Sequence, residues 1–172
     1  RPRVVALRIE DPLRILRGMQ LAARFELVGA PETLEFCRSL SLDGTAPERV
    51  LEEWRKLLVL GRTPSLGLHW LDASGGLAFF PELAALQGCA QDPEFHPEGD
   101  VWVHTLHALD AFARARTGDA REDWVVGLAV LGHDFGKPGT TEFFNGRWRS
   151  HGHDEAGVEP TISFLDTLNI HT

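Results

Sequence analysis

The sequence of 172 residues contains no tyrosine, one methionine and only two cysteines, Cys37 and Cys89. The two cysteines do not form a Cys-x-x-Cys pair, and we expect reduced core thiols in a cytoplasmic protein. No apolar run approaches the roughly 20 residues that cross a bilayer, so we expect no membrane contact. The start, "RPRVVALRIEDPLR", is charged throughout and is no signal peptide. It opens with Arg rather than Met, which indicates part of a longer protein.

Charge is present but unevenly distributed. The formal net charge is -8, with 43% hydrophobic and 24% charged residues, which suits a globular chain. Residues 1–62 carry ten Arg and one Lys against nine acidic residues, a net charge of +2, whereas residues 63–172 carry a net charge of -10. An acidic chain binds nucleic acid poorly without specific contacts. If the protein contacts RNA, we expect the Arg-rich first third to do so; alternatively, these arginines are solvated helix faces with packed apolar stems.

Strand signals are scarce, whereas apolar residues recur often with the helical period, so we predict an all-α fold. Helices are expected over residues 10–27, 31–40, 45–60, 65–76, 100–116, 121–134 and 155–169. We predict a helical body over residues 1–90 and a second helical domain over 91–172. Residues 79–100 should form a short helix and a long ordered loop, and 135–154 a loop.

Local signals place several helix ends. Asp11 suits an N-cap followed by Pro12 at the first helical position, and Asp100 suits the N-cap of a later helix. Thr45 and Glu48 have capping-box spacing. The helix over 121–134 reads as buried on most sides.

The stretch "LGHDFGKPGTT" places His133 and Asp134 at the end of an apolar helix. A buried imidazole and carboxylate are costly unless they pair or bind a cation. Gly136 and Pro138 break the helix, which lets two adjacent side chains aim at one point. Such a pair is often only hydrogen-bonded, without any metal.

Further ligands are available on neighbouring segments. His104, His107 and Asp110 share roughly one helix face, and either histidine could meet His133 and Asp134. His151 and His153 follow in the loop. This donor set suits Mn, Fe, Ni, Co or Zn better than Ca. Such a metal could acidify a bound water and polarise a phosphoryl oxygen.

Other side chains in these segments could contact a phosphate or only water. Lys137 and Arg149 could hold a phosphate as cationic donors. His107 and Asp110 could instead form a polar face, and His96 could be a hydrogen-bonding loop residue.

In combination, "HTLHALDAF", "LGHDFGKPGTT" and "SHGHDEAG" resemble the HD superfamily of metal-dependent phosphohydrolases. "PEFHPEGDVWVHTL" narrows the resemblance to the HD domain of bacterial tRNA nucleotidyltransferases, the CCA-adding enzymes and their poly(A) polymerase relatives. "EDPLRILRGMQLAARF" resembles that family's EDxxR motif and "APERVLEEWRKLL" its neck motif. The resemblance therefore covers nearly the whole chain in the expected order.

The resemblance implies roles for particular residues in the HD part. His104, His133 and Asp134 would be metal ligands, and His153 would face a second metal or the phosphate. Lys137 would contact the phosphate and act with His133 and Asp134 in catalysis. The implied cofactor is a divalent metal, one of Ni, Mn, Mg, Fe or Co.

In the neck, Asp11 and Arg14 resemble residues that read the Watson–Crick edge of CTP or ATP, and Glu48 and Arg49 a supporting pair. Asp can accept from an exocyclic amine and Arg can donate to ring acceptors, so protein could replace a template base. The simpler interpretation of Asp11 is a helix cap.

The same resemblance implies parts that this chain lacks. A nucleotidyltransferase head domain should precede residue 1. An HD site also takes a final Asp from a later helix, and the sequence ends at "LNIHT", so we expect a C-terminally truncated HD domain. Asp154, Asp166 and His171 are available, although not at the expected place.

Three functions follow from these patterns. In the first, the chain is a fragment of an enzyme that adds CCA, CC or A to tRNA, and its HD part hydrolyses 2′,3′-cyclic or terminal phosphates. In the second, it is a non-catalytic scaffold that supports nucleotide and tRNA, with a vestigial HD site. A free-standing nucleotidase is a third, and the neck motifs argue against it.

Overall fold

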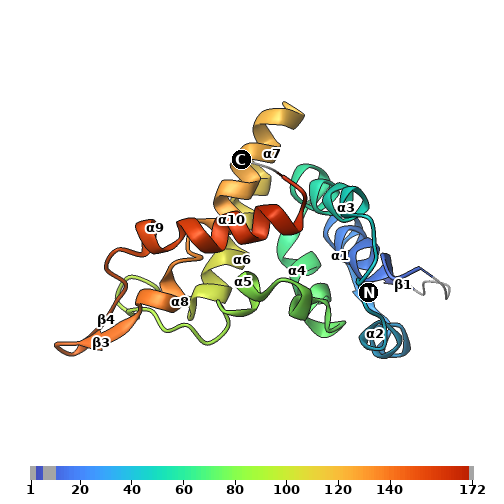
Figure 1. Ribbon diagram of the computed structural model, residues 1–172. Coiled ribbons are helices and arrows are strands. Elements are labelled where there is room, and N and C mark those ends of the chain that lie inside the picture. The colour runs from blue at the N-terminus through green and yellow to red at the C-terminus, as the bar shows by residue number, and fades with distance from the viewer. Residues whose placement is uncertain (1–2, 6–10, 171–172) are drawn as a thin grey trace.

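The computed structural model describes residues 3–5 and 11–170, and helices dominate it (Figure 1). The prediction of an all-α fold is confirmed. Glu10, the expected start of the first helix, and the candidate ligand His171 lie outside the described residues. Among the helices of the described part, none is long and apolar enough to cross a membrane.

The first half consists of four helices and a short strand pair. The helices are α1 (Arg14–Phe25), α2 (Pro31–Arg38), α3 (Pro47–Leu60) and α4 (Pro64–Ala73). The strands β1 (Arg3–Val5) and β2 (Leu27–Gly29) pair in parallel, with Val4 opposite Val28. The helix α1 packs against both α3 and α4. Gly75, with a φ of 77°, follows the C-cap of α4, as expected for a glycine that stops this helix.

The second half has longer helices and short connecting elements. They are a 3₁₀ helix η1 (Gly76–Phe79), α5 (Pro81–Ala84), α6 (Val101–Ala115), α7 (Ala120–Gly132), α8 (Lys137–Thr140), β3 (Glu142–Phe144), β4 (Arg147–Arg149), α9 (His153–Ala156) and α10 (Val158–Thr167). Asp100 caps α6 as predicted, because its side chain accepts the Val103 N–H at 2.9 Å.

Two predicted caps are wrong. Leu13 occupies the cap position of α1, because a turn closed by the Arg14 N–H and the Asp11 carbonyl precedes the helix. Asp11 stabilises that turn by accepting the Leu13 N–H at 3.1 Å. Ala46 caps α3 without a side-chain hydrogen bond, since Pro47 takes the first helical position and Thr45 lies one residue too early.

The segment over 135–154 is more ordered than the predicted loop. It contains α8, an antiparallel hairpin of β3 and β4, and the start of α9. The hairpin turn is Asn145-Gly146, and both residues have positive φ, at 50° and 79°. Asn-Gly is the preferred pair for such a turn, and Figure 1 shows the hairpin projecting at the lower left.

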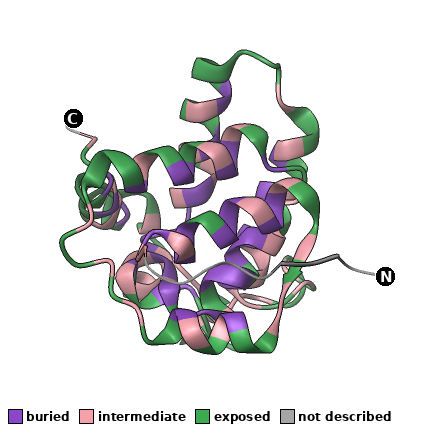
Figure 2. Ribbon diagram, turned by 90° about the vertical axis from the view of Figure 1, so that its right-hand side faces the viewer, coloured by how far each residue is buried: buried purple, intermediate pink, exposed green. Residues whose placement is uncertain are grey.

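The prediction that residues 121–134 are buried on most sides is wrong. Only Asp123, Gly127 and Leu131 of α7 are buried, whereas Val125 is 58% exposed. The apolar residues of α7 face a groove of about 760 Å³ between α6 and α7, with His133 among its lining residues. In Figure 2 the exposed residues lie on the outer sides of the helices and the buried ones between them.

One hydrophobic core joins the two halves of the chain. Trp54 of α3 meets Phe80 and Phe164 edge-on, with ring centroids 5.0 and 5.3 Å apart. Phe135, directly after the predicted site, packs on Phe164 at 5.5 Å. The core therefore supports the backbone on which His133 and Asp134 stand.

Candidate functional site

His133 and Asp134 lie just beyond the end of a helix. The helix α7 ends at Gly132, His133 is its C-cap, and turns continue to Gly136. The sequence placed both residues in the last helical turn, so the helix ends slightly earlier than predicted. Because the backbone has left helical geometry, both side chains can approach one point, and His133 Nε2 lies 3.2 Å from Asp134 Oδ2.

The structure brings three of the predicted histidines to this carboxylate. His104 of α6 forms a group with His133 and Asp134 in which one ligand-type atom of each lies within 4.8 Å of the others. His153, at the start of α9, places Nε2 3.8 Å from Asp134 Oδ1. The group thus gathers side chains from α6, the α7 terminus and α9.

Each imidazole is held by its Nδ1 atom. His133 Nδ1 donates to the Val130 carbonyl at 2.7 Å, and His153 Nδ1 donates to the Ser150 carbonyl at 2.8 Å. His104 Nδ1 lies 2.7 Å from Glu98 Oε1. Because carbonyl and carboxylate oxygens only accept, these contacts put a proton on Nδ1, and each ring in its neutral form then keeps its lone pair on Nε2. His133 Nε2 also faces the Asp134 carboxylate, which favours a second proton on that ring.

Asp134 is the buried anion at the centre of the group, with 2% of its surface exposed. Burial opposes its ionisation, but the neighbouring His133 and Lys137 outweigh burial and lower the Asp134 pKa to about 2. Lys137 Nζ lies 2.8 Å from Asp134 Oδ2. The contact with Asp134 in turn raises the pKa of His133. Asp134 is therefore ionised at neutral pH.

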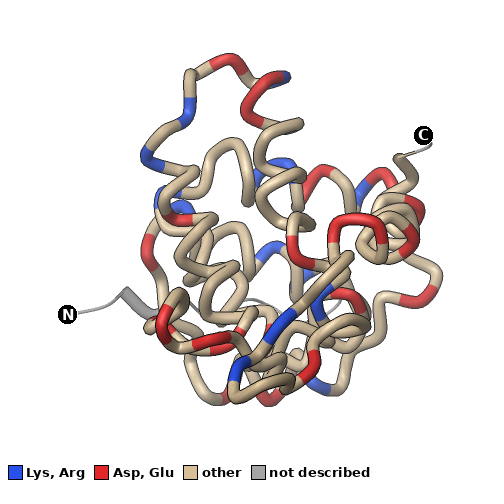
Figure 3. The backbone as a smooth tube through the Cα atoms, turned by 90° about the vertical axis from the view of Figure 1, so that its left-hand side faces the viewer, with Lys and Arg blue, Asp and Glu red and all other residues tan. Residues whose placement is uncertain are grey.

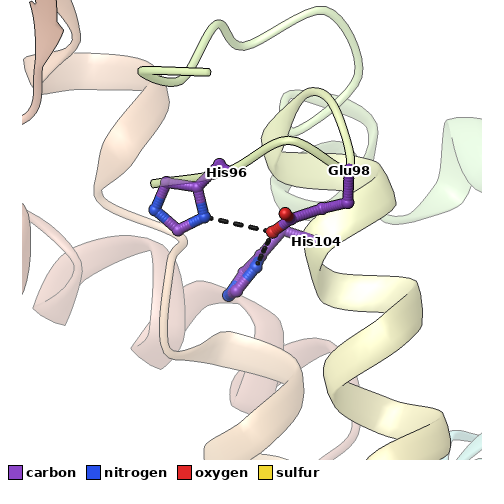
Figure 4. Close-up of side chains that lie close together, drawn as sticks. All are labelled: His96, Glu98 and His104. Carbon is purple, nitrogen blue, oxygen red and sulfur yellow. Dashed lines mark hydrogen bonds and ion pairs between the residues drawn. The ribbon is translucent and has the colours of Figure 1, made fainter. Parts of the chain in front are cut away.

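Glu98 fixes two of the rings at once. Its Oε1 atom lies 3.1 Å from His96 Nδ1 and 2.7 Å from His104 Nδ1, and Figure 4 shows both rings turned toward this carboxylate. Hydrogen bonds from its own backbone and from the two imidazoles lower the Glu98 pKa to about 2. The three residues could themselves ligate an ion. We interpret them as a support for His104, because both Nδ1 atoms are already engaged.

Several predicted candidates do not join the group. His107 and His151 are exposed. Asp110 accepts the Ser65 N–H at 2.9 Å and the Ser65 hydroxyl at 2.7 Å, so it stabilises the start of α4. Arg149 lies over the Phe144 ring at 5.6 Å. His96 is a hydrogen-bonding loop residue, which agrees with the simpler of its interpretations.

Of the residues predicted to read or support the nucleotide, Asp11 and Arg14 lie at the start of α1, and Arg49 of α3 contacts Asp11. Asp11 Oδ2 lies 2.7 Å from Arg49 Nη2 and 3.5 Å from Arg17 Nη1. Burial opposes ionisation of Asp11, but the Leu13 N–H and Arg49 outweigh it and lower the Asp11 pKa. Arg14 Nη1 is buried and has no hydrogen-bond partner among the described residues. Glu48 contacts Asn169 at 3.4 Å instead.

Glu98 lies within the stretch "PEFHPEGDVWVHTL", but nothing in the sequence pattern singles it out as a functional residue. The available signal is that Glu98 stands between two histidines, two residues after His96 and six residues before His104. An acidic side chain between two histidines can fix both tautomers only if the loop folds back onto α6, and the loop path is not readable from spacing.

The structure thus combines an all-α fold with a His–His–Asp group at the end of one helix and on its neighbour. The chain is 39% identical to a Multifunctional CCA protein from Xanthomonas campestris over 94% of its own length and 40% of the relative's. Proteins of the same name from Stenotrophomonas maltophilia and Nitrosococcus oceani are 37% and 38% identical over 95% and 94% of the chain, and over 41% and 39% of their own lengths.

These similarities confirm the predicted resemblance to CCA-adding tRNA nucleotidyltransferases. The chain spans about 40% of the length of these relatives. No protein-family profile matches it.

Proposed function

We propose that this chain is the neck and HD part of a CCA-adding tRNA nucleotidyltransferase. We further propose that its HD part hydrolyses 2′,3′-cyclic or terminal phosphoesters with a divalent metal. His104, His133 and Asp134 would hold the ion. The observation that carries this proposal is that all three histidines around Asp134 are tied through Nδ1, which leaves their Nε2 lone pairs beside a buried carboxylate.

The donor set fits a divalent metal. Neutral Nε2 lone pairs beside an ionised carboxylate repel it unless a cation or a proton lies between them. Asp134 Oδ2 is buried, and the cationic Lys137 Nζ and the His133 Nε2 atom lie 2.8 and 3.2 Å from it. Two imidazoles and one carboxylate suit Ni, Mn, Fe or Co. Such an ion, when bound, supplies a water activated for attack on phosphorus.

Lys137 is the side chain of this group that suits a phosphoryl oxygen. Its ammonium lies 2.8 Å from Asp134 Oδ2 and 2.8 Å from Gln91 Oε1, and its side chain is 12% exposed. These two acceptors hold Nζ at the edge of the His–Asp group. A held ammonium can stabilise charge that develops on the phosphoryl oxygens without first being reoriented.

In the longer protein, Asp11 and Arg14 would read the incoming CTP or ATP, and tRNA would be the acceptor. Arg49 would keep the Asp11 carboxylate in position, since the two form the closest ion pair at this site. The buried Nη1 atom of Arg14, which has no hydrogen-bond partner in the part of the chain that the structure describes, supports the reading role, because an unsatisfied donor gains from a ligand acceptor. The name of the relatives supports CCA addition.

The second candidate, a scaffold with a vestigial site, is favoured by the same Lys137 contact. An ammonium 2.8 Å from Asp134 already supplies a cation to the carboxylate. The His–Asp–Lys group is then an ion-pair network without metal, and the chain serves only to support nucleotide and tRNA.

Metal analysis of the purified chain distinguishes the metal-dependent hydrolase from the scaffold with a vestigial site. Four variants accompany the wild type: His104→Ala, His133→Ala and Asp134→Ala, with His107→Ala as the matched control. His107 stands on the same helix as His104 but is exposed. We expect near-stoichiometric transition metal in the wild type and the control, and its loss in the other three. Hydrolysis of 2′,3′-cyclic AMP should follow the metal content.

A wild-type chain that takes up no metal, even after loading with Ni or Mn, would contradict the hydrolase proposal. Equal metal in all five proteins would place the ion elsewhere and contradict it as well.

A further inference from the structure

A small polar pocket of about 260 Å³ adjoins the His–Asp group. Lys137 and His153 line it, and both also contact Asp134, at 2.8 and 3.8 Å. His96, held by the same Glu98 oxygen as His104, lines it too. A ligand in this pocket would therefore stand next to the proposed centre of phosphoester chemistry. Its volume lies below the range typical of drug-sized ligands, about 300 Å³ and more.

Two aromatic side chains complete the lining, Phe95 and Trp148. Phe95 is 66% exposed and Trp148 is 38% exposed. Trp148 is supported on the hairpin by Phe143, whose ring meets it edge-on at 5.2 Å. Exposed aromatic faces beside cationic side chains are the usual platform for nucleobases, because every base offers a π-face.

The two walls of the pocket are fastened together. Arg147 of β4 pairs with Glu94 of the loop before α6, with Nη2 2.7 Å from Oε2. The same guanidinium lies 6.0 Å from the centre of the Phe95 ring. Thr141 and Ser150, at the two ends of the hairpin, are hydrogen-bonded through their hydroxyls at 2.8 Å. The hairpin is thus held beside the loop that carries Phe95.

The charge of the pocket limits the ligand. Its lining has one lysine, Lys137, and one aspartate, Asp92, whose Oδ1 already accepts the Glu94 N–H at 3.0 Å. Figure 3 faces the end of the molecule with the hairpin and shows basic segments among acidic ones. One ammonium beside an acidic surround suits a single phosphate group better than a polyphosphate.

We propose that this pocket is the nucleoside subsite of the phosphoester site, which binds a nucleotide with one phosphate group at Lys137 and its base on Phe95 and Trp148. The inference rests on the proposed function for the role of Lys137. The ligand is a free mononucleotide or the 3′ end of single-stranded RNA, since both present a stackable base beside a phosphate.

Calorimetric titrations of the chelator-treated chain test the subsite without any turnover. The ligands are adenosine 3′-monophosphate, ribose 5-phosphate and a single-stranded adenosine trinucleotide with a 3′-phosphate. Wild type is compared with Trp148→Ala, Phe95→Ala and the control Phe144→Ala. Phe144 is an exposed aromatic of the same hairpin that does not line the pocket.

We expect adenosine 3′-monophosphate to bind on the order of tenfold more tightly than ribose 5-phosphate in wild type and Phe144→Ala. In Trp148→Ala and Phe95→Ala the two ligands should bind with about equal affinity. If the trinucleotide binds more tightly than adenosine 3′-monophosphate, the ligand is an RNA end. If the two bind equally, the ligand is a free nucleotide.

Equal affinity for the two monophosphates in the wild type, or no binding of either at millimolar concentration, would overturn the subsite. Metal content is measured separately, so a failed subsite leaves the proposed metal centre untouched.

Discussion

At the residue scale, the tautomer of His104 depends on Glu98, a residue that holds no proposed ligand position. Glu98→Gln keeps one accepting oxygen but removes the charge that holds both His96 and His104. We expect the affinity for Ni or Mn to fall about 10–100-fold, as is usual when the partner of a metal-bound histidine changes. Titration with the metal at neutral pH measures the change.

The matched control for that experiment is Glu94→Gln, because Glu94 lies in the same loop but pairs with Arg147 rather than with a histidine. An unchanged metal affinity in a folded Glu98→Gln protein would show that the hydrogen bond does not orient His104.

Asp11 gives a prediction about pH. Its folded-state pKa lies below the ordinary value of 3.8, so the ionised carboxylate stabilises the fold above that value. The stabilisation is lost as the pH falls through the lower folded-state pKa. Asp11→Asn keeps an acceptor for the Leu13 N–H and removes only the charge. We expect it to lower the free energy of unfolding by about 0.2–1 kcal/mol between pH 5 and 7.

The deficit of Asp11→Asn should shrink only below the ordinary pKa, which urea unfolding at several pH values measures. Asp11→Ala also loses the hydrogen bond to Leu13 and should cost about 0.5–1.5 kcal/mol more than Asp11→Asn. A deficit of Asp11→Asn that does not vary down to acid-induced unfolding would contradict the assigned ion pair.

The residues of the candidate site were predictable to different degrees. His133 and Asp134 could be found because two adjacent ionisable side chains precede a Gly-Lys-Pro break at the end of an apolar helix. The expected burial holds for Asp134 only, because His133 is exposed. His104 could be placed only on a helix face shared with His107, since helical spacing alone does not say which of them meets the neighbouring helix. Glu98 depends on the path of a loop, for which the sequence carries no periodic signal.

At the element scale, the contact between α8 and α9 depends on a glycine. A Cβ atom at Gly136 would lie within 3 Å of the His153 carbonyl and of the Gly157 amide nitrogen. Gly136→Ala should therefore separate the two short helices and move His153 away from Asp134. We expect a loss of about 1–3 kcal/mol in the free energy of unfolding, measured by urea denaturation.

Gly139 in the same helix α8 is the matched control, because nothing lies within 4 Å of a Cβ atom placed there. Gly139→Ala should be neutral or should stabilise the protein by about 0.4–1 kcal/mol. Equal stability of Gly136→Ala and Gly139→Ala would contradict the prediction, because α9 would then move away from Gly136 without a loss of stability.

The hairpin of β3 and β4 was missed, although its signal is present in the sequence. "FFNGRW" places an Asn-Gly pair between aromatic residues, which is typical of a two-residue hairpin. The hairpin is short and polar residues surround it, so in a chain dominated by helices its sequence is easily interpreted as a loop. Long helices such as α6 were predictable because their periodic faces and the cap at Asp100 agree.

At the scale of the whole molecule, the two predicted domains share one hydrophobic core. Phe164 of α10 contacts Trp54 of α3 and Phe135 beside the site, with centroids 5.3 and 5.5 Å apart. The division near residue 90 stays a prediction, since sequence composition marks a boundary but not the packing across it. Long-range aromatic contacts of this kind join segments about a hundred residues apart and leave no local pattern.

The shared core predicts cooperative unfolding. Phe164→Ala removes a buried ring that lies against aromatic residues of both halves, so we expect it to lower the free energy of unfolding by about 3–5 kcal/mol. Because the halves are coupled, circular dichroism and tryptophan fluorescence should still give one coincident transition in urea. The control is Phe143→Ala, an exposed hairpin residue, which should cost far less. Two separate transitions in the wild type, with only the later one shifted by Phe164→Ala, would show instead that residues 1–90 and 91–172 fold as independent domains.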